Sequence, residues 1–526
     1  MHRYIDLTFK PYPAPVGDGD GVIRPNLGYR PEAPIHHEPV GKARSKTDVL
    51  SYYRTSYSMS GVQPGEIFQK QILTTKPWTT YATFQNVRET DNWRGKYLAE
   101  LPARDLVGPF TLLDVTSAAK GGVLTAEAIK GALGKQKAER ILILRTGYSD
   151  DRPSTPDQNY LENSPVLDEE AAKYVAGLGI RVLGSDTRSL DPRYTGKGKA
   201  PVYTILNDAG VVVVDDMARL SEIKSNHGTA FIGIPIPMRW TIGGPVRAFA
   251  VDLDNPTDFV DLSHVLDFFP NTHADHPLPF TLPVSDIAME DIGDYPSPWP
   301  GRIEPREEQA KTQRGARLTP FRIFDQGEEI GSDMYIEYNH GTGTHIEAAF
   351  FDPWGRHGVP EDVLKRYIRM PKDRLVGEAT YIDLSDQVGP LQQIDSRHLR
   401  LADPGLKPGD ICVMRADITD WSFYGSTPGN TPGLSPDAAM WLVERKIRAL
   451  VIDFAVEKSD PMPSSPMVKY TPNKIHYYLH KNDIPVVEWC VNMKLLRQKR
   501  FVIAICALPA SHQGGFPAQV FAVEKW

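Results

Sequence analysis

The stretch LDEEAAKYVAGLGIRVLGSD at 167–186 has a counterpart of the same length, LSPDAAMWLVERKIRALVID, at 434–453. In both stretches, apolar residues first recur at helical spacing and then form an unbroken apolar run, which is typical of a buried strand. Gly179 follows the first periodic segment and is expected to end its helix. A helix followed by a buried strand, found twice in one chain, predicts a fold of the α/β class with helices packed on sheets.

Further segment pairs recur in the same order along the chain. They are IDLT (5–8) with VDLS (260–263), LVGPFTLLDVT (106–116) with LVGEATYIDLS (375–385), ILILRTG (141–147) with ICVMRAD (411–417), ILNDAGVVVVDD (205–216) with LHKNDIPVVEWC (479–490), and GGPVRAFAVD (243–252) with GGFPAQVFAVE (514–524). An ordered series of this kind indicates an internal repeat rather than the helix, strand and turn patterns that any α/β protein shares. It predicts two tandem domains, residues 1–255 and 256–526, joined near the DNPTD stretch at 254–258.

Other segments extend this coarse prediction. NKIHYYLHKNDIPVVEW at 473–489 has the pattern of a helix followed by a strand. The runs FVIAICAL at 501–508 and YTILNDAGVVVV at 203–214 are apolar and rich in β-branched residues, so we expect strands there.

Composition excludes several classes of protein. The chain has 526 residues, 41% of them hydrophobic and 24% charged, with a net charge of −7, so nothing favours nucleic-acid binding. The cysteines Cys412, Cys490 and Cys506 form no CxxC motif, and an odd count fits a reducing compartment. No apolar run reaches the ~18 residues that a membrane helix needs, and MHRYIDLTF does not resemble a signal peptide. We therefore expect a cytoplasmic protein of two or three domains.

The segment YNHGTGTHIEAAFF at 338–351 combines two histidines and a glutamate with glycines and threonines, and it is the main candidate for a functional site. Its glycines resemble part of a dinucleotide-binding loop, but Ile346 occupies the third glycine position. The Lys-Ser/Thr pair of a phosphate loop and the G-x-S-x-G turn of serine hydrolases are both absent from this segment. His345 and Glu347 are two residues apart, and on an extended chain alternate side chains share a face. An imidazole and a carboxylate pointing together are what a divalent metal needs.

Further candidate ligands lie on either side of this pair. His340 lies five residues before His345, and His476 and His480 share one face of a helical segment. Glu488 lies within the apolar run IPVVEWC, where a carboxylate is costly unless it is paired or binds a metal. The simpler alternatives are an ion pair with an arginine or a strand face exposed to water.

The motif GTGTHIEAAFF at 341–351 resembles the signature of the cyclase family of metal-dependent hydrolases, His-x-Gly-Thr-His-x-Asp-x-Pro-x-His, a family that includes bacterial kynurenine formamidase and isatin hydrolase. The resemblance covers most of the chain twice. It implies two tandem copies of the swivelling β/β/α domain of that family, and it implies that a histidine on a helix and a glutamate on a strand bind metal, matching His476 and Glu488. The expected ligands are therefore His345, Glu347, His476 and Glu488, with His340 as a further one.

Three departures from the signature bear on the chemistry. Gly341 occupies the first histidine position, Ala349 replaces the proline, and Phe351 replaces the last histidine, which the family uses for proton transfer. We expect Glu347, His340 and His480 to carry the catalytic roles, and His357 is another candidate. Phe350, Phe351 and Trp354 could line an aromatic substrate pocket or could simply pack in the core.

The N-terminal copy has no comparable ligand set. Its counterpart of the motif is PWTTYATF at 77–84, where Tyr81 is expected to correspond to His345 and Thr83 to Glu347. Tyr203 and Asp215 are expected to correspond to His476 and Glu488. The resemblance then implies an intrachain pseudo-dimer with one metal-binding copy and one scaffold copy. Pairing of whole chains as homodimers is a further expectation.

The resemblance implies a zinc- or manganese-dependent hydrolase of a small amide, formamide, lactam or lactone, in which water activated by the metal attacks a carbonyl. The replaced histidines leave an alternative open: a metal-free lyase or cyclase, or a noncatalytic protein that binds a small molecule.

Overall fold

The structure is a computed structural model, and both backbone and side chains are described over most of the two sheet-forming regions. Those residues are 101, 105–150, 163–187, 189–191, 201–215, 217–223, 229–235, 243–252, 344–348, 360, 362–363, 366, 371–389, 392–417, 432–457, 474–490, 492–507 and 515–524, with the backbone alone described at 234, 243–245, 252, 372, 474 and 515–517. The backbone alone is described for strands at 4–6, 12–14, 24–26, 53–59, 67–73, 80–82, 258–261, 317–325 and 328–339. The chain forms two compact units, Arg3–Leu253 with Leu266–His340, and Asp254–Val265 with Gly341–Trp526.

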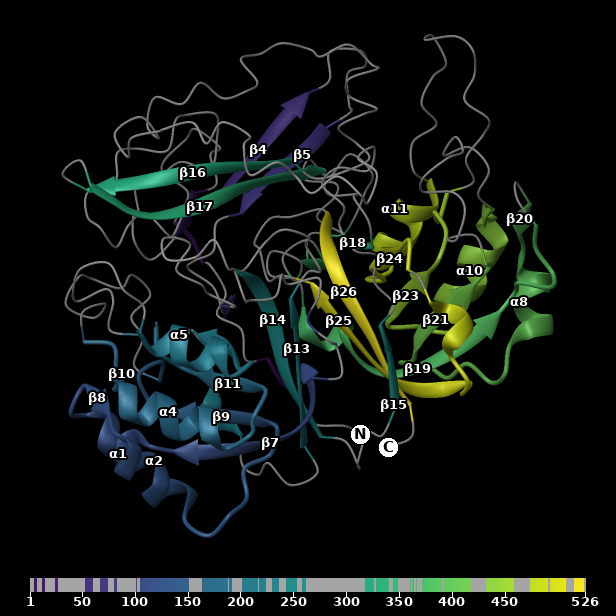
Figure 1. Ribbon diagram of the computed structural model, residues 1–526. Helices are drawn as coiled ribbons and strands as arrows, with labels where there is room; N and C mark the ends of the chain where they lie inside the picture. The colour runs from purple at the N-terminus through teal and green to yellow at the C-terminus, as the bar shows by residue number, and fades with distance from the viewer. Residues whose placement is uncertain are drawn as a thin grey trace, which may run out of the picture. The chain divides into compact units, whose positions relative to one another are not determined.

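The first unit contains an eight-stranded mixed sheet (Figure 1). In spatial order its strands are β1 (Tyr4–Asp6), β14 (Gly243–Asp252), β13 (Thr229–Pro235), β7 (Val107–Asp114), β9 (Ile141–Arg145), β11 (Val182–Ser185), β12 (Val212–Asp215) and β6 (Thr80–Ala82). The three central pairings, β7–β9, β9–β11 and β11–β12, are parallel, and the outer ones are antiparallel. β6 also pairs with β14, so the sheet curls round and closes on itself.

The second unit repeats this order strand for strand. Its strands are β15 (Asp258–Asp261), β26 (Gly515–Glu524), β25 (Arg500–Ala507), β19 (Val376–Asp383), β21 (Ile411–Arg415), β23 (Ala449–Ile452), β24 (Val486–Glu488) and β18 (His345–Glu347). The sheet closes through pairings of β26 with both β25 and β18. Equivalent registers accompany the equivalent order, because Asp114 lies beside Arg145 and Asp383 beside Arg415. The mixed α/β class predicted from the sequence is therefore confirmed.

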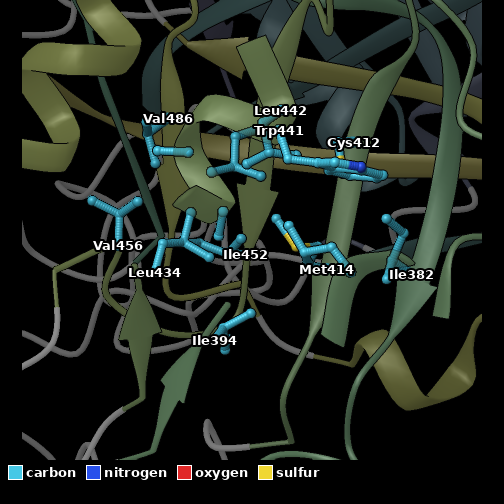
Figure 2. Packing of buried hydrophobic residues seen from close by; sticks show 14 of the residues in the cluster. Ile382, Ile394, Cys412, Met414, Leu434, Trp441, Leu442, Ile452, Val456 and Val486 are labelled. Atoms are coloured by element: carbon cyan, nitrogen blue, oxygen red, sulfur yellow. The ribbon is translucent and has the colours of Figure 1, made fainter. Parts of the chain in front are cut away.

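Short helices cover the sheets. In the first unit these are α1 (Thr116–Ala119), α2 (Ala126–Leu133), α4 (Glu169–Gly177) and α5 (Pro201–Asp208), and in the second α8 (Ser396–Ala402), α10 (Pro436–Glu444) and α11 (Lys474–Lys481). Four of them, α2, α4, α8 and α10, begin with a side-chain cap. Asp168 caps α4 and Ser435 caps α10 by accepting the N–H three residues on. In the second unit Ile382, Met414 and Ile452 from the sheet pack with Trp441 and Leu442 of α10 in one apolar core (Figure 2).

The strand predicted over YTILNDAGVVVV is wrong in its first half. Pro201–Asp208 is helix α5, and only Val212–Asp215 is a strand. Val202 and Leu206 lie one turn apart on a single buried face, so helical spacing dominates over the β-branched composition. The corresponding helix of the second unit is α11, whose sequence was correctly predicted as helical.

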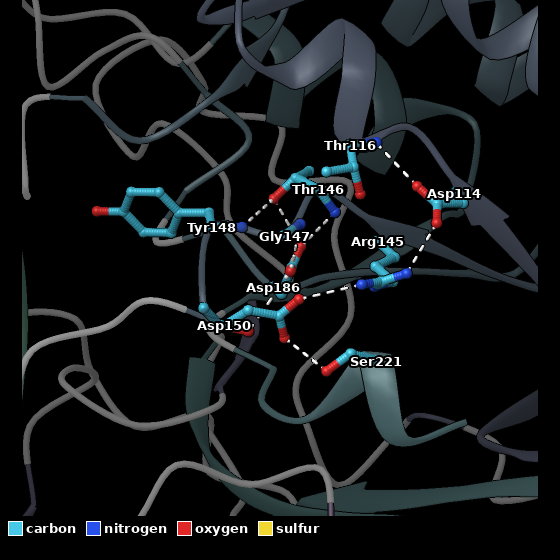
Figure 3. A network of polar contacts seen from close by, with 10 residues as sticks. Asp114, Thr116, Arg145, Thr146, Gly147, Tyr148, Asp150, Asp186 and Ser221 are labelled. Atoms are coloured by element: carbon cyan, nitrogen blue, oxygen red, sulfur yellow. Dashed lines mark hydrogen bonds and ion pairs between the residues drawn. The ribbon is translucent and has the colours of Figure 1, made fainter. Parts of the chain in front are cut away.

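A polar network joins the carboxyl ends of the parallel strands in the first unit (Figure 3). Arg145 donates to Asp114 at 2.8 Å, and buried Asp186 accepts from the backbone N–H groups of Thr146 at 2.7 Å and Gly147 at 3.0 Å. The second unit has the same arrangement, with buried Asp453 accepting from Ala416 N–H at 2.8 Å and Asp417 N–H at 2.9 Å. In each unit one buried carboxylate therefore fixes the turn that follows a central strand.

A separate four-stranded sheet has the order β16 (Arg317–Asp325), β17 (Glu328–Asn339), β5 (Ile67–Leu73) and β4 (Tyr53–Met59). Its two hairpins come from sequence regions far apart, and they meet through antiparallel pairing of β17 with β5, from Ile336 beside Leu73 to Asn339 beside Lys70. All four strands belong to the first unit, although β16 and β17 come after β15 in sequence. The boundary predicted near residue 255 stays a prediction.

Candidate metal centre

Two neighbouring strands place three of the predicted ligands. β18 carries His345 and Glu347 on alternate positions of an extended segment, so both side chains lie on one face. β24 runs antiparallel beside β18, and Glu488 is the direct cross-strand partner of His345. The hydroxyl of Thr344 donates to the carbonyl oxygen of Trp489 at 2.8 Å and ties the two strand ends together.

A helix supplies the fourth side chain. α11 ends five residues before β24 begins, and its buried residue His476 lies 12 positions before Glu488 in the chain. The Nε2 atom of His476 lies 2.8 Å from Oε2 of Glu347 and 3.2 Å from Oε1 of Glu488. The Nε2 atom of His345 lies 3.3 Å from Oε1 of Glu347 and 3.7 Å from Oε2 of Glu488. Two imidazoles and two carboxylates thus meet at one buried point.

Charge within this cluster changes its proton affinities. Burial disfavours the charged form of Glu347, but the positive charges and polar contacts of His476 and His345 together outweigh burial and hold the pKa of Glu347 well below its usual value. Burial likewise opposes the imidazolium form of His476, and the carboxylates of Glu347 and Glu488 outweigh it, so the pKa of His476 is raised well above 6.5. Without a metal, His476 is therefore positively charged at neutral pH.

The donor set fits a divalent metal ion. Ligand atoms of His345, Glu347 and Glu488 all lie within 4.8 Å of one another, and all three residues are buried. His476 Nε2 makes no contact with hydrogen-bond geometry among the described residues, although carboxylate oxygens lie 2.8 and 3.2 Å away. Among these four side chains, His345 Nε2 and Glu347 Oε1 have hydrogen-bond geometry at 3.3 Å, whereas His476 shares its contacts between two carboxylates, as side chains around one central ion do. Two imidazole nitrogens with two carboxylates suit zinc or manganese.

Two residues that the sequence analysis did not single out support this cluster. The backbone N–H of Val456 donates to Oε1 of Glu488 at 2.6 Å and so fixes that carboxylate. Oε1 of Glu457 accepts the N–H groups of Ile475 at 2.7 Å and His476 at 3.0 Å at the start of α11. The sequence held one signal that could have pointed to Glu457. The first copy also has an acidic residue at this place, Asp191, which accepts the N–H of Tyr203.

His480 is placed beside the cluster rather than within it. It is fully buried, and its ring lies 5.8 Å from the ring of His476, edge to face. Neither ring nitrogen has a partner with hydrogen-bond geometry among the described residues, although the backbone of Glu347 lies near enough to favour protonation. Burial and the charge of His476 lower the pKa of His480 to about 3, so its ring is neutral.

The remaining predicted site residues lie outside the described part of the chain. They are His340, Gly341, Phe350, Phe351, Trp354 and His357.

One family model matches the chain in two separate segments. The model of the Cyclase family matches residues 32–192 and again residues 260–457, together more than half of the chain. The chain belongs to the Cyclase family. The four clustered side chains all lie within or after the second matched segment.

Individual relatives are distant. A kynurenine formamidase from Geobacillus thermodenitrificans (strain NG80-2) is 26% identical over 154 residues, which cover 29% of this chain and 67% of the relative. Isatin hydrolase A from Labrenzia aggregata, solved with benzyl benzoate, is 19% identical and has a TM-score of 0.35, covering 48% of this chain and 94% of the other. A potential metal-dependent hydrolase with cyclase activity is 14% identical with a TM-score of 0.32, covering 51% and 99%. None of the described helices is long and apolar enough to cross a membrane.

Strand register corrects the counterparts expected in the first unit. Asp215 pairs with Thr80 across β12 and β6, as Glu488 pairs with His345 across β24 and β18. Thr80 therefore corresponds to His345, and the expected match of Tyr81 is wrong by one residue. The same register makes Ala82 the counterpart of Glu347, whereas Thr83, the residue predicted for that place, lies outside the described residues. A one-residue slip turns every side chain to the other face, so sequence similarity alone did not fix this pairing.

A hydrogen-bonded pair occupies the remaining ligand positions of the first unit. The hydroxyl of buried Tyr203 donates to the carboxylate of Asp215 and also bonds Ser189 Oγ at 2.8 Å. Tyr203 and Asp215 are 12 residues apart, as His476 and Glu488 are. A hydroxyl group thus partners the buried carboxylate where the second unit presents an imidazole.

The Tyr203→Phe variant tests this assignment. Removing the hydroxyl takes one donor from a fully buried carboxylate, so the free energy of unfolding should fall by about 1–3 kcal/mol. Denaturant unfolding measures the change, and metal content of the purified variant should equal that of the wild type. A loss of bound metal in Tyr203→Phe would contradict the assignment of the metal centre to the second unit alone.

Proposed function

We propose that the chain is a metal-dependent hydrolase of a small amide, formamide, lactam or lactone. The observation that carries the proposal is the convergence of His345, Glu347, His476 and Glu488 at one buried point. Family membership and the kynurenine formamidase relative support hydrolysis of a small C–N substrate. A divalent ion in such a site lowers the pKa of the water it binds toward ~7 and polarises the carbonyl group under attack.

The chain's own residues would hold the centre ready for this chemistry. His345 and His476 offer neutral nitrogens once His476 loses its extra proton, and Glu347 and Glu488 supply the negative charge that balances a divalent ion. The N–H of Val456 keeps the carboxylate of Glu488 in one orientation. The catalytic roles predicted for Glu347, His340 and His480 belong to this proposal, as does an aromatic substrate held by Phe350, Phe351 and Trp354.

We further infer that the chain arose by duplication and pairs with itself as a pseudo-dimer. Both family segments and the identical strand order of the two sheets support duplication. The sheet β16-β17-β5-β4 supports pairing of the copies, because its middle strands β17 and β5 come from different copies and pair edge to edge. On this proposal, residues 1–255 form the scaffold copy and residues 256–526 form the metal-binding copy. Association of whole chains into homodimers stays a prediction.

The test is reconstitution of activity. Protein stripped with a chelator should be inactive on a panel of aryl formamides, cyclic imides and lactones, and should regain hydrolysis with zinc or manganese but not magnesium. Hydrolysis that persists in the stripped protein, or none with any ion despite stoichiometric binding, would favour the metal-free lyase or binding-protein alternative.

Metal binding should depend on pH in a stated direction. The raised pKa of His476 keeps it protonated in the metal-free protein, and the imidazole must lose that proton to bind an ion. Affinity should therefore rise by about tenfold per pH unit from pH 6 upward and level off above the raised pKa. Competition with a chelating dye at pH 6, 7 and 8 measures this, and an affinity independent of pH would mean that His476 is not a ligand.

A further inference from the structure

Glu457 lies on the side of His476 that faces away from the other carboxylates. Its Oε1 atom accepts the backbone N–H groups of Ile475 and His476 and lies 3.4 Å from Nδ1 of the His476 ring. Nε2 of the same ring faces Glu347 and Glu488. One carboxylate thus contacts both the backbone that carries His476 and the ring nitrogen that the cluster does not use.

The first unit has a counterpart of the backbone contact. Asp191 occupies the corresponding place, because the residue before each acid accepts the equivalent backbone hydrogen bond, Leu190 from Leu167 and Val456 from Leu434. Asp191 accepts the N–H of Tyr203 at 3.0 Å, so an aspartate is enough to hold the start of such a helix. The side chain of Glu457 is one methylene longer than that of Asp191. Glu457 accepts from the start of a helix that carries the imidazole of His476, where the first unit has the phenol of Tyr203.

We propose that Glu457 is a positioning residue that holds the His476 imidazole with Nδ1 protonated and Nε2 turned toward the metal centre. The inference rests on the proposed function and adds a residue to it. A carboxylate behind a ligating histidine fixes the ring's tautomer and orientation and raises the basicity of the nitrogen that binds the ion. At 3.4 Å the contact is longer than an ordinary N–H···O hydrogen bond, so it acts chiefly through charge and direction.

The experiment compares Glu457→Ala and Glu457→Asp with the wild-type full-length chain. Zinc affinity is measured by chelator competition. The tautomer of His476 is read in the zinc-loaded protein, where the imidazole is neutral, from ¹⁵N chemical shifts of histidine-labelled protein, with the His476→Gln spectrum providing the assignment. Glu457→Ala should bind zinc about 10–100-fold more weakly and lose the pure Nδ1–H form of His476. Glu457→Asp should keep the helix start, as Asp191 does, and recover part of the affinity.

Asp191→Ala is the matched control, because it removes the equivalent cap from the helix of the first unit. It should lower the melting temperature about as much as Glu457→Ala does and leave zinc affinity unchanged. If Glu457→Ala lowers only the melting temperature, with wild-type zinc affinity and tautomer, Glu457 is a helix cap and the inference is wrong while the proposed function stands. If the wild type binds no zinc, the inference and the proposed function fail together.

Discussion

The Glu488→Gln variant should lose at least about 100-fold in metal affinity and about 10³-fold in kcat/KM for any amide that the wild type hydrolyses. Loss of an outer partner of a metal ligand costs roughly 10–100-fold, and loss of a ligand's charge should cost more. Glutamine keeps the length of the side chain and an oxygen that can still accept the N–H of Val456, so the effect should come from charge rather than from unfolding. Metal titration and steady-state kinetics on the same preparation measure both changes.

Asp215→Asn is the matched control for that variant. Asp215 occupies the place of Glu488 in the first unit and accepts a hydrogen bond from Tyr203. Its replacement should leave metal content and kcat/KM at wild-type values. If Asp215→Asn and Glu488→Gln reduced activity equally, the second unit would not be the sole site of the chemistry.

The second large effect is expected from Asp453→Ala. Asp453 is buried and accepts the N–H groups of Ala416 and Asp417, which hold the end of β21 against the turn after β23. Leaving these donors without their partner should cost about 2–5 kcal/mol of unfolding free energy. Because Val456 lies three residues further along the same turn and donates to Glu488, metal affinity should also fall, by about tenfold or more. Chemical unfolding and chelator competition measure the two effects.

Asp186→Ala makes the equivalent change in the first unit. It removes the acceptor for Thr146 and Gly147 and should destabilise that unit by a similar amount. Metal affinity should stay at the wild-type value under conditions where the variant is folded. Equal losses of affinity in both variants would indicate that the turn acts on the centre only through global stability.

The repeat was readable from the sequence because similar segments recur in the same order, and one helix–strand stretch recurs at equal length. The stretches at 167–186 and 434–453 have equal length, and each contains the expected helix and strand in order. Helix α5 was predicted as a strand because its residues Tyr203 and Ile205, together with the valine run that follows, have high β propensity. In the folded chain, packing of the helical face that carries Val202 and Leu206 decides for the helix.

Part of the centre was also predictable. Alternation along a strand is enough to place His345 and Glu347 on one face, and an acidic residue within an apolar run drew attention to Glu488. Glu457 could not be found in the same way, because its role depends on a turn that brings it beside a helix that begins 17 residues later. The first-unit pairing was also beyond sequence reasoning, since register is set by backbone hydrogen bonds that similarity between short segments does not report.

Metal content per chain, measured by mass spectrometry on dialysed wild-type protein, tests the central claim most directly. The account predicts about one equivalent of zinc or manganese bound in the second unit, present also in Asp215→Asn and absent from Glu488→Gln. Protein that stays free of metal after incubation with excess zinc and manganese would contradict it, because the two imidazoles and two carboxylates would then form a buried ion-pair cluster and nothing more.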